Sequence, residues 1–155
     1  MDTSPLGCGI LLEGYNCFNI TIEQNVVKNI LRHGILTYGG DSIHVLNNTV
    51  TNVAYNGIYF YEGCQNSTIA YNFVNNTNYN QMSGSNGGIK LLDDNNDRNE
   101  IFNNTVQNCW RGMYLRDSSN NSIYNNTVRN VEDGGIILSS NANENIRFII
   151  CPLFL

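Results

Sequence analysis

Three acidic residues stand at the same distance from a recurring glycine in the middle of this 155-residue sequence. Each lies five positions after its glycine, and together they are Glu62, Asp93 and Asp117. Paired carboxylates can serve as general acid, general base or nucleophile in the cleavage of a glycosidic bond. Carboxylate oxygens are also the ligands that Ca²⁺ prefers in proteins. We therefore treat these three residues as candidate catalytic groups and as candidate ligands of a calcium ion.

Aromatic and basic side chains accompany the carboxylates. Two positions after the same glycines the sequence has Tyr59, Lys90 and Tyr114, and close to them stand Tyr61, Arg111 and Arg116. A tyrosine ring offers an apolar face with a polar tip, on which a sugar ring can stack. Basic side chains pair with anionic groups such as those of uronates. The sequence therefore predicts that these six residues contact carbohydrate.

The candidate residues belong to an internal repeat. A glycine followed by an apolar–x–apolar triplet begins each unit, at intervals of 25, 23, 31, 24 and 23 residues from Gly9 to Gly135. Alternation over three to five residues indicates short strands, and no segment holds helical spacing for three turns. Three strands and three turns in a unit of about 23 residues predict a coil of an all-β parallel β-helix, with about six coils in total.

Asparagine supplies much of the polarity that charged residues provide elsewhere. The sequence contains 29 asparagines, whereas charged residues make up only 14%. The module Asn-Asn-Thr-Val recurs at 47–50, 103–106 and 125–128, with looser copies at 24–27 and 71–74. Because asparagine tolerates the left-handed backbone, we expect the second residue of each copy to turn the chain in that conformation. Stacked amides would then form a hydrogen-bonded ladder, predicted to consist of Asn25, Asn48, Asn72, Asn104 and Asn126.

The repeat resembles a known group of proteins. The segment Gly112–Asn130 (GMYLRDSSNNSIYNNTVRN) is similar to the right-handed parallel β-helix repeats of NosD-like, pectin-lyase-like and carbohydrate-binding and sugar-hydrolase (CASH) domains. The resemblance extends over about Gly9 to Asn145. It implies a right-handed coil with ligands along the outer face of the first strand of each coil. These families include polysaccharide lyases, hydrolases, epimerases and non-catalytic surface proteins.

The spacing of the coils bears on the chemistry of the acidic column. Neighbouring coils in a sheet lie about 4.8 Å apart, so adjacent carboxylates would be separated by about 5 Å, as in retaining glycosidases. Carboxylates two coils apart would lie about 10 Å from each other, just beyond the inverting range. Three stacked carboxylates also repel one another, so Lys90, Arg116 or Ca²⁺ must offset their charge. A plainer interpretation is that these are solvated acidic residues at turns that favour aspartate.

The repeat also sets the domain organisation. We expect a lead-in at 1–8, repeats at 9–145 and an apolar tail at 146–155 that is either a cap or the end of a truncated piece of a longer repeat protein. The long interval of 31 residues marks an insertion at 76–87. This insertion is either a functional wall beside the acidic column or a neutral, Ser/Gly-rich loop.

Composition narrows the function. A net charge of −5 argues against binding of nucleic acid, and no apolar run reaches the roughly 20 residues of a membrane span. We expect an extracellular or cell-surface module that binds a polysaccharide or glycoconjugate, with Ca²⁺ as the one candidate cofactor. The alternatives are a structural stalk or adhesin segment without a site, which would associate end to end, and a polysaccharide lyase, hydrolase or epimerase.

Overall fold

The computed structural model describes residues 7–78, 86–93 and 95–143, and every regular element in them is a β-strand. All strand pairs are parallel. The strands are β1 (Ile10–Glu13), β2 (Phe18–Glu23), β3 (Val26–Ile30), β4 (Ile35–Leu46), β5 (Thr49–Val53), β6 (Ile58–Gln65), β7 (Thr68–Ala70), β8 (Phe73–Thr77), β9 (Gly87–Leu92), β10 (Glu100–Phe102), β11 (Thr105–Arg116), β12 (Ser122–Tyr124) and β13 (Thr127–Ser139).

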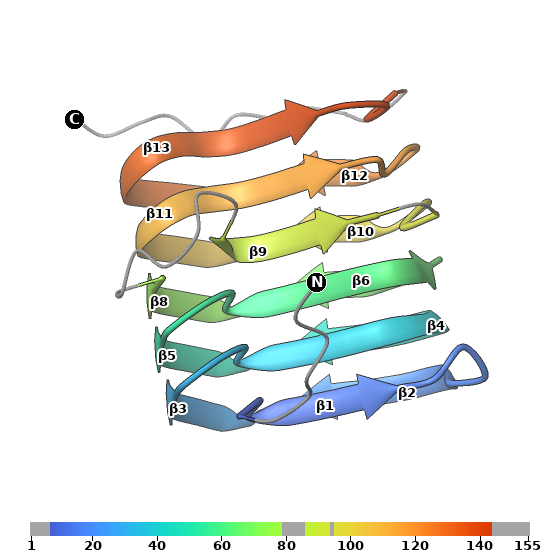
Figure 1. The fold of residues 1–155 in the computed structure, drawn as a ribbon, viewed down its shortest axis with the longest axis horizontal. Coiled ribbons are helices and arrows are strands. Elements are labelled where there is room, and N and C mark those ends of the chain that lie inside the picture. Colours follow the sequence, from blue (N-terminus) through green and yellow to red (C-terminus); the bar gives the residue numbers. More distant parts are fainter. Residues whose placement is uncertain (1–6, 79–85, 94, 144–155) are drawn as a thin grey trace.

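The chain winds as a solenoid with three sides, which confirms the predicted parallel β-helix. The first side of each coil faces the viewer in Figure 1, from β1 at the bottom to β13 at the top, and the path rises as a right-handed coil. Three long strands continue around a corner of the solenoid. β4 forms part of the first and second sides of one coil, whereas β11 and β13 each form the third side of one coil and the first side of the next. The described residues therefore contain five complete coils and the opening strand of a sixth, rather than six coils.

A strict register places equivalent residues of successive coils above one another. Ile35 pairs with Ile58, which pairs with Ile89, which in turn pairs with Met113. All four point inward and are fully buried, as are Val45, Ile69 and Ile101 on the second side and Val50, Val74 and Val106 on the third. Burial of such a side chain contributes about 1.5–3 kcal/mol. The repeat thus builds one continuous apolar core along the axis.

The corner between the second and third sides carries the predicted asparagine ladder. Asn48 donates its backbone N–H and its side-chain amide to Oδ1 of Asn72, at 2.9 and 3.1 Å. Asn72 bonds Asn104 in the same way at 3.0 Å, and the pattern continues to Asn126 and back to Asn25. These bonds satisfy corner backbone groups that would otherwise be unpaired in the interior.

The left-handed residue of this corner is not the ladder residue, which corrects the expectation. Positive φ occurs one position earlier, at Gln24, Asn47, Tyr71, Asn103 and Asn125. The ladder residue instead has ordinary backbone torsions, and its amide points inward. The turn residue bends the chain and the next residue joins the coils, so each of the two positions in the Asn-Asn pair has a separate role.

A second ladder, absent from the sequence prediction, lies at the start of the second side. The hydroxyl of Ser67 accepts from the N–H of Ile43, and the side-chain oxygen of Asn99 accepts from the N–H of Ser67, each at 2.9 Å. Asn121 continues the series by accepting from Asn99 at 2.9 Å. Here too a left-handed residue precedes each ladder residue, as at Asn66 before Ser67.

Part of the predicted domain organisation lies outside the described residues. This holds for most of the lead-in, for 79–85 of the insertion and for the apolar tail at 146–155. Within the described part of the chain there is no helix long and apolar enough to cross a membrane.

Candidate functional site

The outward column of the first side forms as the glycine spacing predicts. Tyr59 pairs with Lys90, and Lys90 with Tyr114, so the three side chains stand one above another on successive coils. The ammonium of Lys90 lies 5.0 Å from the ring centre of Tyr59 and 5.8 Å from that of Tyr114. Burial, with a further effect of Arg116, lowers the pKa of Lys90 to about 8. A cation between two rings gains cation–π stabilisation.

These three side chains are nevertheless buried. Tyr59 is 8% exposed, Lys90 3% and Tyr114 5%, although all three project from the outer face of the sheet. Burial also raises the pKa of the Tyr59 phenol far above its ordinary value. Little of either tyrosine ring is therefore open to a ligand among the described residues, and none of the three side chains lines the groove described below. The prediction that they contact sugar stays a prediction.

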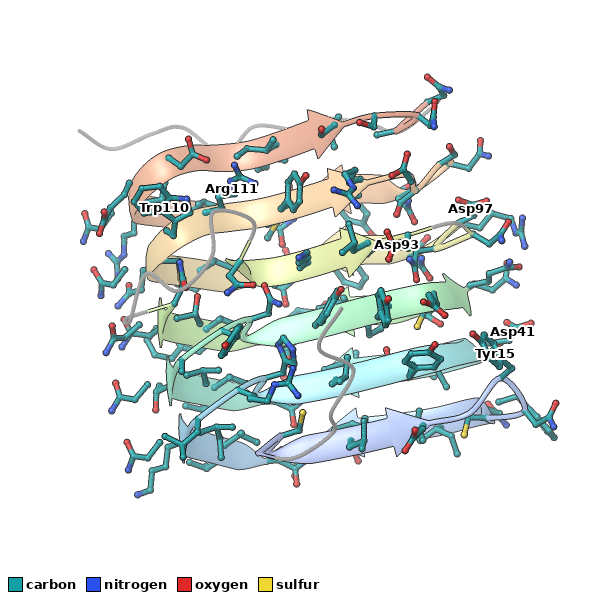
Figure 2. All side chains as sticks on the ribbon, in the orientation of Figure 1. Tyr15, Asp41, Asp93, Asp97, Trp110 and Arg111 are labelled. Atoms are coloured by element: carbon teal, nitrogen blue, oxygen red, sulfur yellow. The ribbon has the colours of Figure 1, made fainter. Side chains whose placement is uncertain are left out.

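Arg111 lies beside Tyr114 but away from the acidic column. Its guanidinium packs 4.7 Å from the Tyr114 ring and pairs with Asp133. Figure 2 shows it near Trp110 at the left end of the first side, whereas Asp93 lies toward the right end. The structure therefore does not bring Arg111 to the acidic column.

The acidic column occupies the left-handed position at the end of the first side. Glu62, Asp93 and Asp117 have φ of 49°, 69° and 52°, and Gly39 has φ of 69° at the same place in the second coil. Aspartate tolerates this conformation, so turn geometry accounts for Asp93 and Asp117. Glutamate has no such preference. Its presence at this position therefore needs another reason, which its contacts supply.

Glu62 is held by two phenols from the preceding coils. Oε2 of its carboxylate accepts hydrogen bonds from Tyr38 at 2.6 Å and from Tyr15 at 2.8 Å. The Tyr38 phenol, with those of Tyr61 and Tyr15 beside it, lowers the pKa of Glu62, and the Tyr38 pKa rises in return. Tyr15 lies in the turn between β1 and β2, so these bonds tie the first three coils together. Glu62 thus stays ionised and unsuited to act as a general acid.

Acidification should release this contact. Because the folded-state pKa of Glu62 lies below its ordinary 4.5, the carboxylate stabilises the fold above that pH and loses its contribution as pH falls through the lowered value. Wild type should therefore melt about 2 °C or more above Glu62→Gln at pH 7, and this difference should shrink as pH falls through the lowered pKa. Thermal unfolding followed by circular dichroism at several pH values measures it, with Glu23→Gln as the control. A difference between wild type and Glu62→Gln that does not change with pH would contradict the assignment.

Arg116 offsets the repulsion between the other two carboxylates. Its guanidinium lies 3.3 Å from Asp93 and 3.2 Å from Asp117. Among the described residues, no three side chains of histidine, cysteine, aspartate or glutamate are grouped so that they could hold a metal ion. Arg116, one of the three partners expected to balance the acidic column, thus lies at Asp93 and Asp117, whereas Glu62 is held by phenols that were not among the expected partners.

A groove opens along this corner. It encloses about 740 Å³, and its aromatic and acidic lining consists of Tyr15, Tyr61, Glu62, Asp93 and Asp117. Gly63, Gln65 and Asn95 complete the lining. The volume is that of an ordinary small-ligand site. The accessible site therefore lies two to six positions further along the chain than the outward column, at the end of the first side.

Several of these residues were not predicted from the sequence. Tyr38 is the second-coil equivalent of Tyr61, with which it pairs directly, so the repeat could have identified it. Gln65 and Asn95 lie in corners of different length. Tyr15 has no counterpart in other coils, and nothing in the spacing indicates that it reaches Glu62 two coils away.

Parallel coils, internal ladders and a polar groove on the first side define a β-solenoid with a candidate ligand site. The chain matches the family model described as right handed beta helix region over residues 8–151, and it belongs to this right-handed β-helix family. No curated protein and no solved structure matches the chain.

Proposed function

We propose that this chain is a carbohydrate-binding β-helix module whose ligand lies in the groove at the end of the first side. The observation that carries the proposal is the lining of this groove, in which the Tyr61 ring stands beside three carboxylates and two side-chain amides. The ring offers an apolar face to a pyranose. The carboxylates accept hydrogen bonds from sugar hydroxyls, and Gln65 and Asn95 both donate and accept.

The charge of the groove favours neutral sugars or amino sugars over uronates. Its lining contains Glu62, Asp93 and Asp117 but no lysine or arginine among the described residues. Of the adjacent cations, Arg116 is paired with Asp93 and Asp117, and Arg98 donates to the side-chain oxygens of Gln65 and Asn66. A uronate carboxylate would meet like charge from the three carboxylates of the lining. Such a ligand also suits the proposed extracellular or cell-surface location, where polysaccharides and glycoconjugates occur.

Truncation of the exposed ring tests the groove. Tyr61→Ala should weaken binding of neutral oligosaccharides at least about tenfold, or about 1.4 kcal/mol, because aromatic anchors dominate such sites. Isothermal titration calorimetry with a panel of soluble oligosaccharides measures the change. Tyr61→Phe keeps the ring and should retain most of the affinity, and Tyr55→Ala removes a tyrosine outside the groove. Equal affinity of Tyr61→Ala and wild type would refute the assignment.

A structural stalk is the second candidate, and the first coil favours it. Within the described residues, β1, β2 and β3 pair on one side only. Phe18, Val26 and Leu31 are each at least 70% exposed in this coil. Unpaired strand edges can template the addition of another chain, so end-to-end association would build a rod. A stalk without a site predicts that wild type binds none of the oligosaccharides, which separates the two candidates.

A further inference from the structure

One corner residue departs from the rule that the others follow. The left-handed position before the asparagine ladder holds glutamine or asparagine in four coils, but tyrosine in the third, where Tyr71 has φ of 60°. An aromatic side chain in this conformation carries a strain of the kind found at functional sites, whereas asparagine tolerates it well. Tyr71 therefore opposes local backbone preference, and its side chain must have another use.

The exposure of Tyr71 is equally unusual. Seven large apolar or aromatic side chains are exposed in the described residues, and five of them lie between residues 11 and 31. The other two are Tyr71, at 54%, and Phe73, at 36%, and both lie at this same corner. Away from the first coil, exposed aromatic surface is thus concentrated at one place on the solenoid. Such concentration marks an interaction site more often than isolated exposure does.

The rings form a continuous strip across three coils. Ala70 pairs with Phe102, and Phe102 with Tyr124, so the two rings follow each other along the axis. Phe102 and Tyr124 are stacked with ring centres 4.9 Å apart, and Tyr71 meets the edge of Phe102 at 5.5 Å and 80°. We call Tyr71, Phe102 and Tyr124 the corner aromatic strip.

Polar rows border the strip on both sides. Two positions earlier on the second side stand Thr68, Glu100 and Ser122, in register with one another. The left-handed asparagines of the next two coils, Asn103 and Asn125, follow the rings directly. Burial and the neighbouring Glu100 carboxylate raise the pKa of Tyr124, which indicates that this carboxylate lies close to the strip.

We propose that the corner aromatic strip is a second carbohydrate-binding site, which takes a neutral glycan chain. The exposed Tyr71 ring, bordered by hydroxyl, amide and carboxylate groups, matches a pyranose, whose faces are apolar and whose edges carry hydroxyls. A protein partner would require a broader apolar area, which the bordering polar rows interrupt. The strip lies at the corner between the second and third sides, whereas the groove lies where the first side ends, so this proposal stands independently of the groove.

Tyr71→Asn tests the proposal because it restores the residue type that the corner prefers. Cellohexaose, xylohexaose and maltohexaose are titrated by calorimetry into wild type, Tyr61→Ala, Tyr71→Asn and the double variant. At least one probe should bind Tyr61→Ala, and Tyr71→Asn should weaken that binding at least about tenfold. The thermal midpoint of Tyr71→Asn should equal or exceed that of wild type, since the strained tyrosine has been removed.

Three results would overturn the proposal. The first is that Tyr61→Ala, which keeps the strip intact, binds none of the three probes. The second is that the double variant binds them as tightly as Tyr61→Ala, or that the midpoint of Tyr71→Asn falls, as expected for a purely structural ring. The third is that light scattering shows wild type to be a dimer and Tyr71→Asn a monomer. This result would identify the strip as a contact between copies of the chain.

Discussion

Replacement of Asn72 by leucine should lower the free energy of unfolding by about 2–6 kcal/mol. Asn72 is 1% exposed, and its amide donates to the carbonyl of Val45 at 2.8 Å. Its side-chain oxygen accepts from the backbone N–H and the amide of Asn48. Leucine fills a similar volume but removes the side-chain partner of the Val45 carbonyl and of the Asn48 N–H, whereas the Asn48 amide keeps its bonds to the carbonyls of Ile22 and Leu46. Each buried unsatisfied group costs about 1–3 kcal/mol.

Asn76 provides the matched control, since it belongs to the exposed column four residues after the ladder. It has φ of 55°, and its amide bonds Asn52 at 2.9 Å in contact with solvent. Asn76→Leu should therefore cost about 1–2 kcal/mol, mainly because leucine is disfavoured in the left-handed region. Urea unfolding followed by circular dichroism measures both variants. Equal losses for Asn72→Leu and Asn76→Leu would show that the buried ladder does not hold the coils together.

Gly57→Ala should destabilise the protein by about 2–3 kcal/mol, although it adds a single methyl group. A Cβ at this position would lie 2.4 Å from Cγ1 of Val74 and 2.6 Å from the backbone oxygen of Gly88. The second contact is with the main chain of the next coil, so a side-chain rotation cannot relieve it. The recurring glycine thus permits the first side of one coil to approach both the third side and the coil above.

The same column contains its own control at Gly135, in the sixth coil. A Cβ there would have Val128 Cγ1 as its nearest neighbour, at 3.9 Å, which is an ordinary contact. Gly135→Ala should therefore change stability by no more than about 0.5 kcal/mol. Chemical unfolding of the two variants side by side makes the comparison. Similar losses in both would mean that glycine is needed for backbone flexibility and not for close approach.

The fold could be predicted because a parallel solenoid converts sequence period into spatial register. Asn48, Asn72 and Asn104 stand above one another, and their spacing alone identified the ladder. The left-handed residue was assigned one position too late because either member of an Asn-Asn pair suits that conformation. The third coil favours the wrong choice, since the left-handed position there holds Tyr71 and asparagine stands only at the next position. The number of coils was overestimated because the Asn-Asn-Thr-Val module is missing after Gly135.

The candidate site was predicted only in part. The repeat located the columns of Glu62 and Tyr59 correctly, because register depends on sequence spacing. Period-two alternation distinguishes inward from outward but does not determine exposure, and so the burial of Tyr59 and Lys90 could not be foreseen. Tyr15 reaches Glu62 from a turn without a counterpart in other coils. Contacts of this kind depend on the path of a single loop, about which a repeat carries no information.

Amide chemical-shift mapping tests the central claim, that carbohydrate binds in the groove. The ¹⁵N-labelled Tyr71→Asn variant, in which the corner strip is disabled, is titrated with the oligosaccharide that calorimetry identifies as the tightest ligand. The account predicts the largest shifts at the groove amides of Tyr61, Gly63, Gln65 and Asn95. Shifts confined to other sides of the solenoid, or no shifts at saturating ligand, would contradict it.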